Sequence, residues 1–159
     1  MIKGLHHNAY RCKDSEETRQ FYQDFLGLKF KNAFEIETTQ TGRETSVLHS
    51  FYEMADGSSL AFFEAPDQPF EFKKQHDFDL HIALEVSYDF LLVMLEKGKK
   101  EGIETRGISD HGFIESIYFR DPNGYVIELT AKKNDSEENN GAKPAPEEIL
   151  SRWQNEKVI

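Results

Sequence analysis

The stretch DHGFIESIYFRDPNGYVIELTA, residues 110–131, decides the fold because it contains two alternating strands around a tight turn. In its first half Ile117 and Phe119 occupy one face and Tyr118 the other, which is the period of a half-buried strand. The turn is Asp-Pro-Asn-Gly at 121–124, where proline fixes its own φ and the next two residues tolerate positive φ. The stretch therefore predicts a strand hairpin.

The second strand of this hairpin carries a carboxylate on an apolar background. Ile127 and Leu129 form its buried set, so Glu128 points to the opposite face, which it shares with Tyr118. A carboxylate in so apolar a strand needs a cation or a metal as its partner.

Two other segments are alike: GLHHNAYRC at 4–12 and DLHIALEV at 79–86, each followed by a predicted helix. Superposing them on the shared His-x-Ala spacing makes His7, rather than His6, the equivalent of His81. In the second segment the apolar residues alternate, which turns His81 to the face that the helix does not cover.

Each half of the chain also ends in a similar phrase, DGSSLAFFEA at 56–65 and DPNGYVIELTA at 121–131. Both halves begin with a histidine strand and end with a glutamate strand, with Glu64 and Glu128 in matching phrases. This pattern predicts a doubled β-α-β-β-β unit.

These residues resemble the vicinal oxygen chelate superfamily, which includes glyoxalase I, extradiol ring-cleaving dioxygenases, fosfomycin-resistance enzymes and bleomycin-binding proteins; the resemblance covers residues 2–131. It implies an α+β fold in which two paired βαβββ modules form a curled mixed β-sheet around a metal cleft. It also implies the metal ligands His7, His81 and Glu128, with Glu64 at the place of the fourth ligand of glyoxalase I. Two imidazoles and one carboxylate suit Fe(II), and Mn(II) is the other expected ion.

The residues around Glu128 favour ring cleavage. Extradiol dioxygenases carry a histidine, an apolar-Tyr pair, an Asp-Pro-x-Gly turn and a ligand Glu, matched here by His111, Tyr118, residues 121–124 and Glu128. The resemblance implies that His111 and Tyr118 are catalytic, contacting a small substrate with vicinal oxygens, such as a catechol, or the bound dioxygen, and helping to move protons. Three positions depart from that family: Ser109 stands two places before His111, Ser58 aligns with an acid–base histidine, and Glu64 stands where those enzymes keep a non-ligand.

Three alternatives remain open from the sequence. A glyoxalase I-like lyase or isomerase would use Glu64 as a fourth ligand around Ni, Zn or Co and act through a metal-stabilised enediolate. A fosfomycin-type thiol transferase is suggested by SIYF at 116–119, although no cationic pocket for a phosphonate is evident. A metal-free binding module of the resistance type would normally have lost the His and Glu set that this chain retains.

The composition excludes several classes of partner. The chain has 159 residues, a formal net charge of −10 and no basic run, which argues against nucleic acid and an anionic membrane. Its one cysteine, Cys12, allows no intrachain disulfide, and no signal region or membrane-length apolar stretch is present, so we expect a cytoplasmic protein. Whether one chain or a homodimer with exchanged modules forms the site stays open.

The expected organisation is a single domain over 1–131, with module one at 1–65, a linker at 66–78 and module two at 79–131. Residues 132–159 are predicted to be a polar linker and a C-terminal helix that docks on the body or on a second subunit. The other predicted elements are a strand at 4–12, a helix from Asp14 or Ser15 to 26, strands at 28–37, 44–53 and 59–64, a helix at 87–102 with Phe90, Leu91, Met94 and Leu95 buried, and a strand at 103–108. His49, in the middle strand of module one, is interpreted as a half-buried structural residue.

Overall fold

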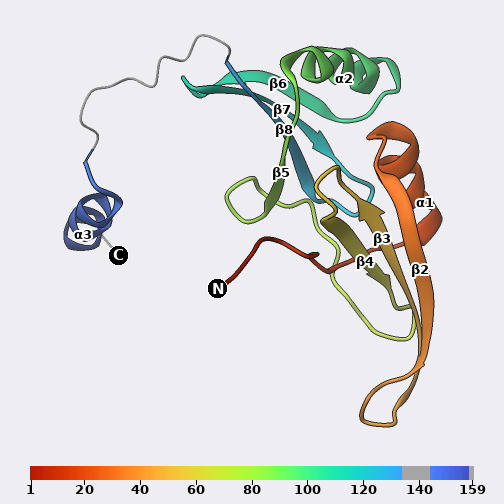
Figure 1. Ribbon diagram of the computed structural model, residues 1–159. Coiled ribbons are helices and arrows are strands. Elements are labelled where there is room, and N and C mark those ends of the chain that lie inside the picture. The colour runs from red at the N-terminus through yellow and green to blue at the C-terminus, as the bar shows by residue number, and fades with distance from the viewer. Residues whose placement is uncertain (134–143, 158–159) are drawn as a thin grey trace.

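The computed structural model describes residues 1–133 and 144–157. The first module comprises β1 (Tyr10–Arg11), α1 (Ser15–Arg19), the π-helical turn η1 (Gln20–Phe25), β2 (Lys29–Thr38), β3 (Glu44–Glu53) and β4 (Ser59–Glu64). The second comprises β5 (His81–Glu85), α2 (Tyr88–Lys100), β6 (Thr105–Asp110), β7 (Ile114–Arg120) and β8 (Val126–Lys132), and α3 (Pro146–Glu156) follows (Figure 1).

Each module builds one four-stranded mixed sheet, in the orders β1-β4-β3-β2 and β5-β8-β7-β6. The first strand of each module pairs in parallel with the last, and the other pairings are antiparallel. The α+β fold of two βαβββ units that the sequence predicts is therefore confirmed. Each sheet has a short edge strand near a predicted histidine ligand. Strand β1 begins three residues after His7, and β5 begins with His81.

Local chemistry explains most element boundaries. The Asp14 carboxylate accepts a hydrogen bond from the Glu17 amide at 2.8 Å and caps α1, and Ser87 caps α2 through the Phe90 amide. The first strand is much shorter than the predicted 4–12: only Tyr10–Arg11 form a ladder, and His7 makes an isolated bridge to Ser59. The predicted helix after it divides into α1 and η1.

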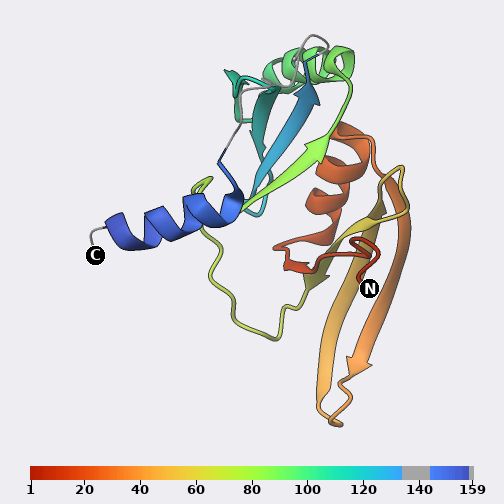
Figure 2. The same ribbon diagram turned by 60° about the vertical axis from the view of Figure 1, so that its left-hand side comes forward.

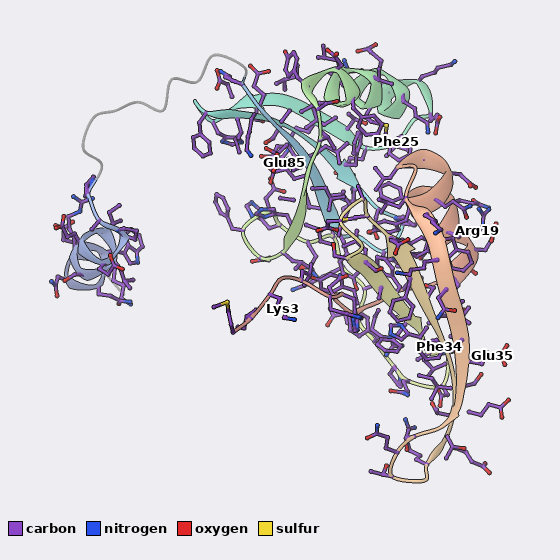
Figure 3. All side chains as sticks on the ribbon, in the orientation of Figure 1. Lys3, Arg19, Phe25, Phe34, Glu35 and Glu85 are labelled. Atoms are coloured by element: carbon purple, nitrogen blue, oxygen red, sulfur yellow. The ribbon has the colours of Figure 1, made fainter. Side chains whose placement is uncertain are left out.

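One hydrophobic core spans both modules. The Phe25 ring of η1 meets the Phe119 ring of β7 edge to face, with centroids 5.1 Å apart, and Figure 3 shows Phe25 where the two modules meet. In α2, Leu91, Met94 and Leu95 are buried as predicted. Phe90 is 40% exposed, so its assignment to the buried stripe was wrong.

Buried polar contacts fix the two modules against each other. The Tyr22 hydroxyl donates to Asp121 at 2.9 Å, the Tyr125 hydroxyl donates to the Arg11 carbonyl at 2.7 Å, and the Lys13 amide donates to Asn123 at 2.8 Å. These contacts lie on the helix side of each sheet. The faces that carry His7 and Glu128 are the opposite ones, so they remain available for a ligand or a partner.

The remaining segments lie outside this core. Residues between β4 and β5 form no helix or strand, and the far end of the β2–β3 hairpin projects away from the rest of the first module (Figure 2). The predicted C-terminal helix is present as α3, and its apolar residues Ile149, Leu150 and Trp153 are exposed, so docking on another subunit stays a prediction. Most of the predicted polar linker, residues 134–143, lies outside the described residues. Within the described residues, the helices are too short or too polar to span a bilayer.

Candidate metal centre and active site

His81 and Glu128 form the centre of the site in the second module. The His81 Nε2 lies 3.4 Å from a Glu128 carboxylate oxygen, while His81 Nδ1 lies 2.7 Å from the Asp77 carbonyl oxygen. Because a carbonyl can only accept, Nδ1 donates to Asp77, and Nε2 is the nitrogen that faces Glu128. Metal-binding imidazoles are commonly held in this way, with one nitrogen bound to a backbone carbonyl and the other turned toward the ligand site.

Glu128 is 7% exposed and lies opposite Tyr118 in the β7–β8 ladder. The Tyr118 hydroxyl donates to Glu128 Oε1, the carboxylate oxygen that does not face His81, at 3.4 Å. His111 Nε2 lies 3.0 Å from the same hydroxyl. Burial, followed by the negative charge of Glu128, raises the pKa of Tyr118, so the hydroxyl stays protonated near neutral pH. The structure thus lines up His111, Tyr118, Glu128 and His81 in one row, in which hydrogen bonds join the first three and the contact between His81 and Glu128 adds the fourth.

This row lines a cleft of about 690 Å³, which Phe78, Phe113 and Ile114 also border. The Arg106 guanidinium lies over the Tyr118 ring, 4.5 Å from its centroid, and pairs with the Asp77 carboxylate. Asp77 therefore holds His81 through its carbonyl and Arg106 through its side chain. Sequence reasoning missed both residues, because the β6–β7 register brings Arg106 beside Tyr118, and Asp77 reaches the site only through its contacts with His81 and Arg106.

The structure does not bring His7 to this row within one chain. The His7 ring contacts the rings of His49 and Phe51 at centroid distances of 6.2 and 5.5 Å, and its Nδ1 lies 2.7 Å from that of His6. Among the described residues, no three acidic, histidine or cysteine side chains come together as a metal site. One chain thus presents two separate parts of the predicted ligand set.

The strand register also differs from the sequence alignment at Glu64. In the second module β5 pairs Ala83, two residues after His81, with Glu128. In the first, His7 pairs with Ser59 and Tyr10 with Phe62, so the counterpart of Glu128 is Ala61. Glu64 lies three residues further along, where its carboxylate accepts a hydrogen bond from the Ser15 amide at 2.8 Å. This register does not favour Glu64 as a fourth ligand, and that role stays a prediction.

Two further polar residues of the first module were singled out by the sequence. Ser58 is buried in a turn, where its amide and hydroxyl both bond to the Asp56 carboxylate, so it performs a local structural role. His49 is more buried than expected, 5% exposed, and burial lowers the pKa of its imidazole, so the ring is neutral at pH 7.

With this geometry in hand, the class of protein follows. A profile of the Glyoxalase/Bleomycin resistance protein/Dioxygenase superfamily matches residues 4–129, and the chain belongs to that superfamily. Its repeated modules and the His81–Glu128 pair are the structural features that accord with this membership.

Among individual proteins, the chain is 26% identical over 134 residues to a Bacillus subtilis (strain 168) protein with the provisional name ring-cleaving dioxygenase MhqA. The match covers 82% of this chain but only 40% of that protein, so the chain spans about two fifths of the length of this relative.

Solved structures share the fold. A glyoxylase/bleomycin resistance protein/dioxygenase domain from Frankia sp. EAN1pec is 18% identical, with a TM-score of 0.65 over 84% of this chain and 100% of that one. The fosfomycin resistance protein FosX from Listeria monocytogenes, solved with Mn(II) and sulfate, is 22% identical, with a TM-score of 0.61 over 85% and 97%. A glyoxalase/dioxygenase from Nostoc punctiforme is 22% identical, with a TM-score of 0.62 over 83% and 92%.

Proposed function

We propose that this chain is a metal-dependent dioxygenase that cleaves the ring of a small catechol-like substrate with O2, in a site that a homodimer completes. The observation that carries the proposal is the row His111, Tyr118, Glu128 and His81 in one cleft. In this row a histidine and a tyrosine hydroxyl, which can exchange protons, lie beside the two proposed ligands. The provisional name of the Bacillus subtilis relative points to the same chemistry.

The residues present fit a divalent metal. The Glu128 carboxylate is buried beside the Nε2 atom of His81, and the described structure gives it no lysine or arginine partner. A buried carboxylate is costly without a cation, and His81 already turns this ring nitrogen toward it. His7 would complete two imidazoles and one carboxylate, the set suited to Fe(II) or Mn(II). When bound, such an ion would supply Lewis acidity and the electron transfer needed to use O2.

The chain's own residues account for the proton movements. A catechol loses protons when its oxygens bind as a chelate, and we assign the role of the base to His111, which lines the cleft. The Tyr118 hydroxyl orients one substrate oxygen while it keeps its bond to Glu128. In the overall reaction the carbon–carbon bond beside the diol breaks and both atoms of O2 enter the product, so the ring supplies all the electrons and no other reductant is required.

A second copy supplies His7 in this proposal. The buried contacts between Tyr22 and Asp121 and between Tyr125 and Arg11 hold the modules of one chain by their helix sides, so closing the site within one chain would break the core. Each sheet instead ends at an edge near its histidine. If β1 of one copy lies beside β5 of another, His7 and His81 meet, and a two-fold dimer forms two such sites.

The glyoxalase I-like alternative loses support because the strand register does not put Glu64 in the position that corresponds to Glu128. A glyoxalase I-like reaction with Ni, Zn or Co relied on Glu64, but the residue of the first module that corresponds to Glu128 is Ala61.

The buried free thiol of Cys12 suits a reducing compartment, and we include the cytoplasm in the proposal.

The experiment is a metal and turnover measurement on the intact protein. Protein purified without oxygen is analysed by elemental mass spectrometry, loaded with Fe(II) or Mn(II), and mixed with a panel of catechols in an oxygen electrode. The proposal expects about one ion per site and oxygen uptake equal to the ring-opened product, one O2 per catechol. Full metal loading with no oxygen uptake on any catechol would refute the dioxygenase, and no metal binding at all would leave a binding module.

A further inference from the structure

The outer face of the first sheet carries an aromatic wall, which we define as Phe34, His49, Phe51 and Phe63. The ladder pairs Phe34 with His49 and His49 with Phe63, so their side chains project from the same face. His49 stacks on Phe63 with centroids 3.7 Å apart and lies 4.2 Å from the Phe51 ring. Figure 3 labels Phe34 and the next residue, Glu35, which leave β2 on opposite sides.

His49 holds a defined tautomer within this wall. Its Nδ1 lies 3.0 Å from the Phe62 carbonyl oxygen, so this nitrogen carries the proton and donates it. Nε2 therefore has a lone pair, and none of the described residues donates to it. A histidine whose Nδ1 is held by a backbone carbonyl on an apolar surface can accept a hydrogen bond from a ligand at Nε2.

The wall lies beside His7. The His7 ring is 5.5 Å from the Phe51 ring and 6.2 Å from His49, measured between centroids. Whatever brings His7 to His81 and Glu128 must therefore bring the wall to the same site. Val47 and Ile36, two residues before His49 and two after Phe34, extend the face with apolar side chains. This face favours a flat, neutral ring over an anionic substrate.

We propose that the aromatic wall binds the ring of the substrate and that His49 Nε2 accepts a hydrogen bond from a ring hydroxyl. This inference rests on the proposed function and adds a specificity determinant that the first module supplies. The second module would then hold the reacting oxygens, and the wall would select an aromatic diol over an aliphatic one of similar size. Offset ring stacking and a single hydrogen-bond acceptor are the interactions used.

Equilibrium binding tests the inference without turnover. The metal-loaded protein is titrated with catechol and with cis-cyclohexane-1,2-diol by calorimetry in the absence of oxygen. His49→Phe keeps an aromatic ring but removes the acceptor, and we expect it to weaken catechol binding by about tenfold. His49→Gln retains an acceptor oxygen and should recover most of this loss. Metal content, measured on each variant, should be unchanged.

The wall itself is tested with a matched pair of variants on one strand. Phe34 is 44% exposed on the wall, whereas Phe30 is 38% exposed on the other face, where it stacks on Tyr52. Phe34→Ala should weaken catechol binding by about three- to tenfold and cyclohexanediol binding much less. Phe30→Ala should leave catechol affinity unchanged.

The outcomes separate the two proposals. If the wild-type protein binds no catechol, the proposed function and the inference fall together. If the wild-type protein binds and cleaves catechol while His49→Phe and Phe34→Ala bind it equally well, the inference is wrong and the function stands. Weaker binding by Phe34→Ala alone would overturn the role of His49.

Discussion

The two modules repeat one fold but carry different chemistry on their exposed faces. The second places a buried carboxylate, Glu128, against His81, whereas the first has Ala61 at the corresponding position, beside the aromatic wall. After duplication of such a unit, one copy can keep the ligands and proton-transfer groups while the other offers one histidine and a binding surface. In the proposed mechanism, this asymmetry means that neither module alone makes a site.

The largest expected effect is on the carboxylate that distinguishes the modules. Glu128→Ala should abolish metal retention, because it removes the one charged ligand of the set. Elemental mass spectrometry after dialysis measures this, with far-ultraviolet circular dichroism as the check on folding. Glu64→Ala is the matched control and should keep full metal, because Glu64 bonds to the Ser15 amide instead. A Glu128→Ala protein with full occupancy would disprove the ligand assignment.

The next effect concerns the proton-transfer group that only the second module carries. His111→Phe should retain metal but lower turnover by about 10²- to 10⁴-fold, the usual contribution of a general acid or base. Oxygen uptake with catechol provides the rate, and metal analysis shows that the ion is still bound. Turnover equal to that of the wild-type protein would remove His111 from the mechanism.

Removing the hydrogen bond between Tyr22 and Asp121, which joins the two modules, should lower stability without directly changing the proposed reaction. Tyr22→Phe removes the buried hydroxyl that donates to Asp121, and we expect the free energy of unfolding to fall by about 1–3 kcal/mol. Urea denaturation measures the change. Tyr10→Phe is the control, since the structure gives the Tyr10 hydroxyl no hydrogen bond among the described residues; its effect should be within about 0.5 kcal/mol. Equal losses in both variants would argue against the Asp121 contact.

The smallest effect is expected at the ion pair beside His81. Hydrogen bonding to Arg106 lowers the pKa of Asp77 in the folded chain. The pair therefore stabilises the fold at neutral pH, and this contribution is lost as the pH falls from about 4 through the lower folded pKa. Arg106→Met should cost less than about 1 kcal/mol at pH 7 because Arg106 is largely exposed. The difference between variant and wild type should shrink as the pH falls below about 4 and vanish once Asp77 is protonated in the folded chain; a constant difference would exclude the ion pair as its cause.

Much of the fold could be predicted from the sequence because its signals are local. The alternation around Tyr118 and Glu128, the Asp-Pro-Asn-Gly turn and the His-x-Ala repeats each specify a strand, a turn or a face. These signals also place His111, Tyr118, His81 and Glu128 in one module, where a hairpin and a parallel pair bring them together.

What the sequence missed depends on register and packing. Glu64 and Glu128 occur in similar phrases, but the pairing of Tyr10 with Phe62 shifts Glu64 by three residues and turns it to the helix side, a change that composition does not reveal. The separation of His7 from His81 follows from buried contacts such as that between Tyr22 and Asp121, 99 residues apart, which no local pattern encodes.

The central claim is that His7 of one copy and Glu128 of another share a site, and a mixed-variant experiment tests it most directly. His7→Ala and Glu128→Ala are produced separately and together in one cell, and metal content and catechol turnover are measured. Each variant alone should be inactive. Random pairing makes half of the dimers mixed, and one of the two sites in each is intact, so about a quarter of wild-type activity should return. A co-produced mixture no more active than either variant alone would contradict the shared site.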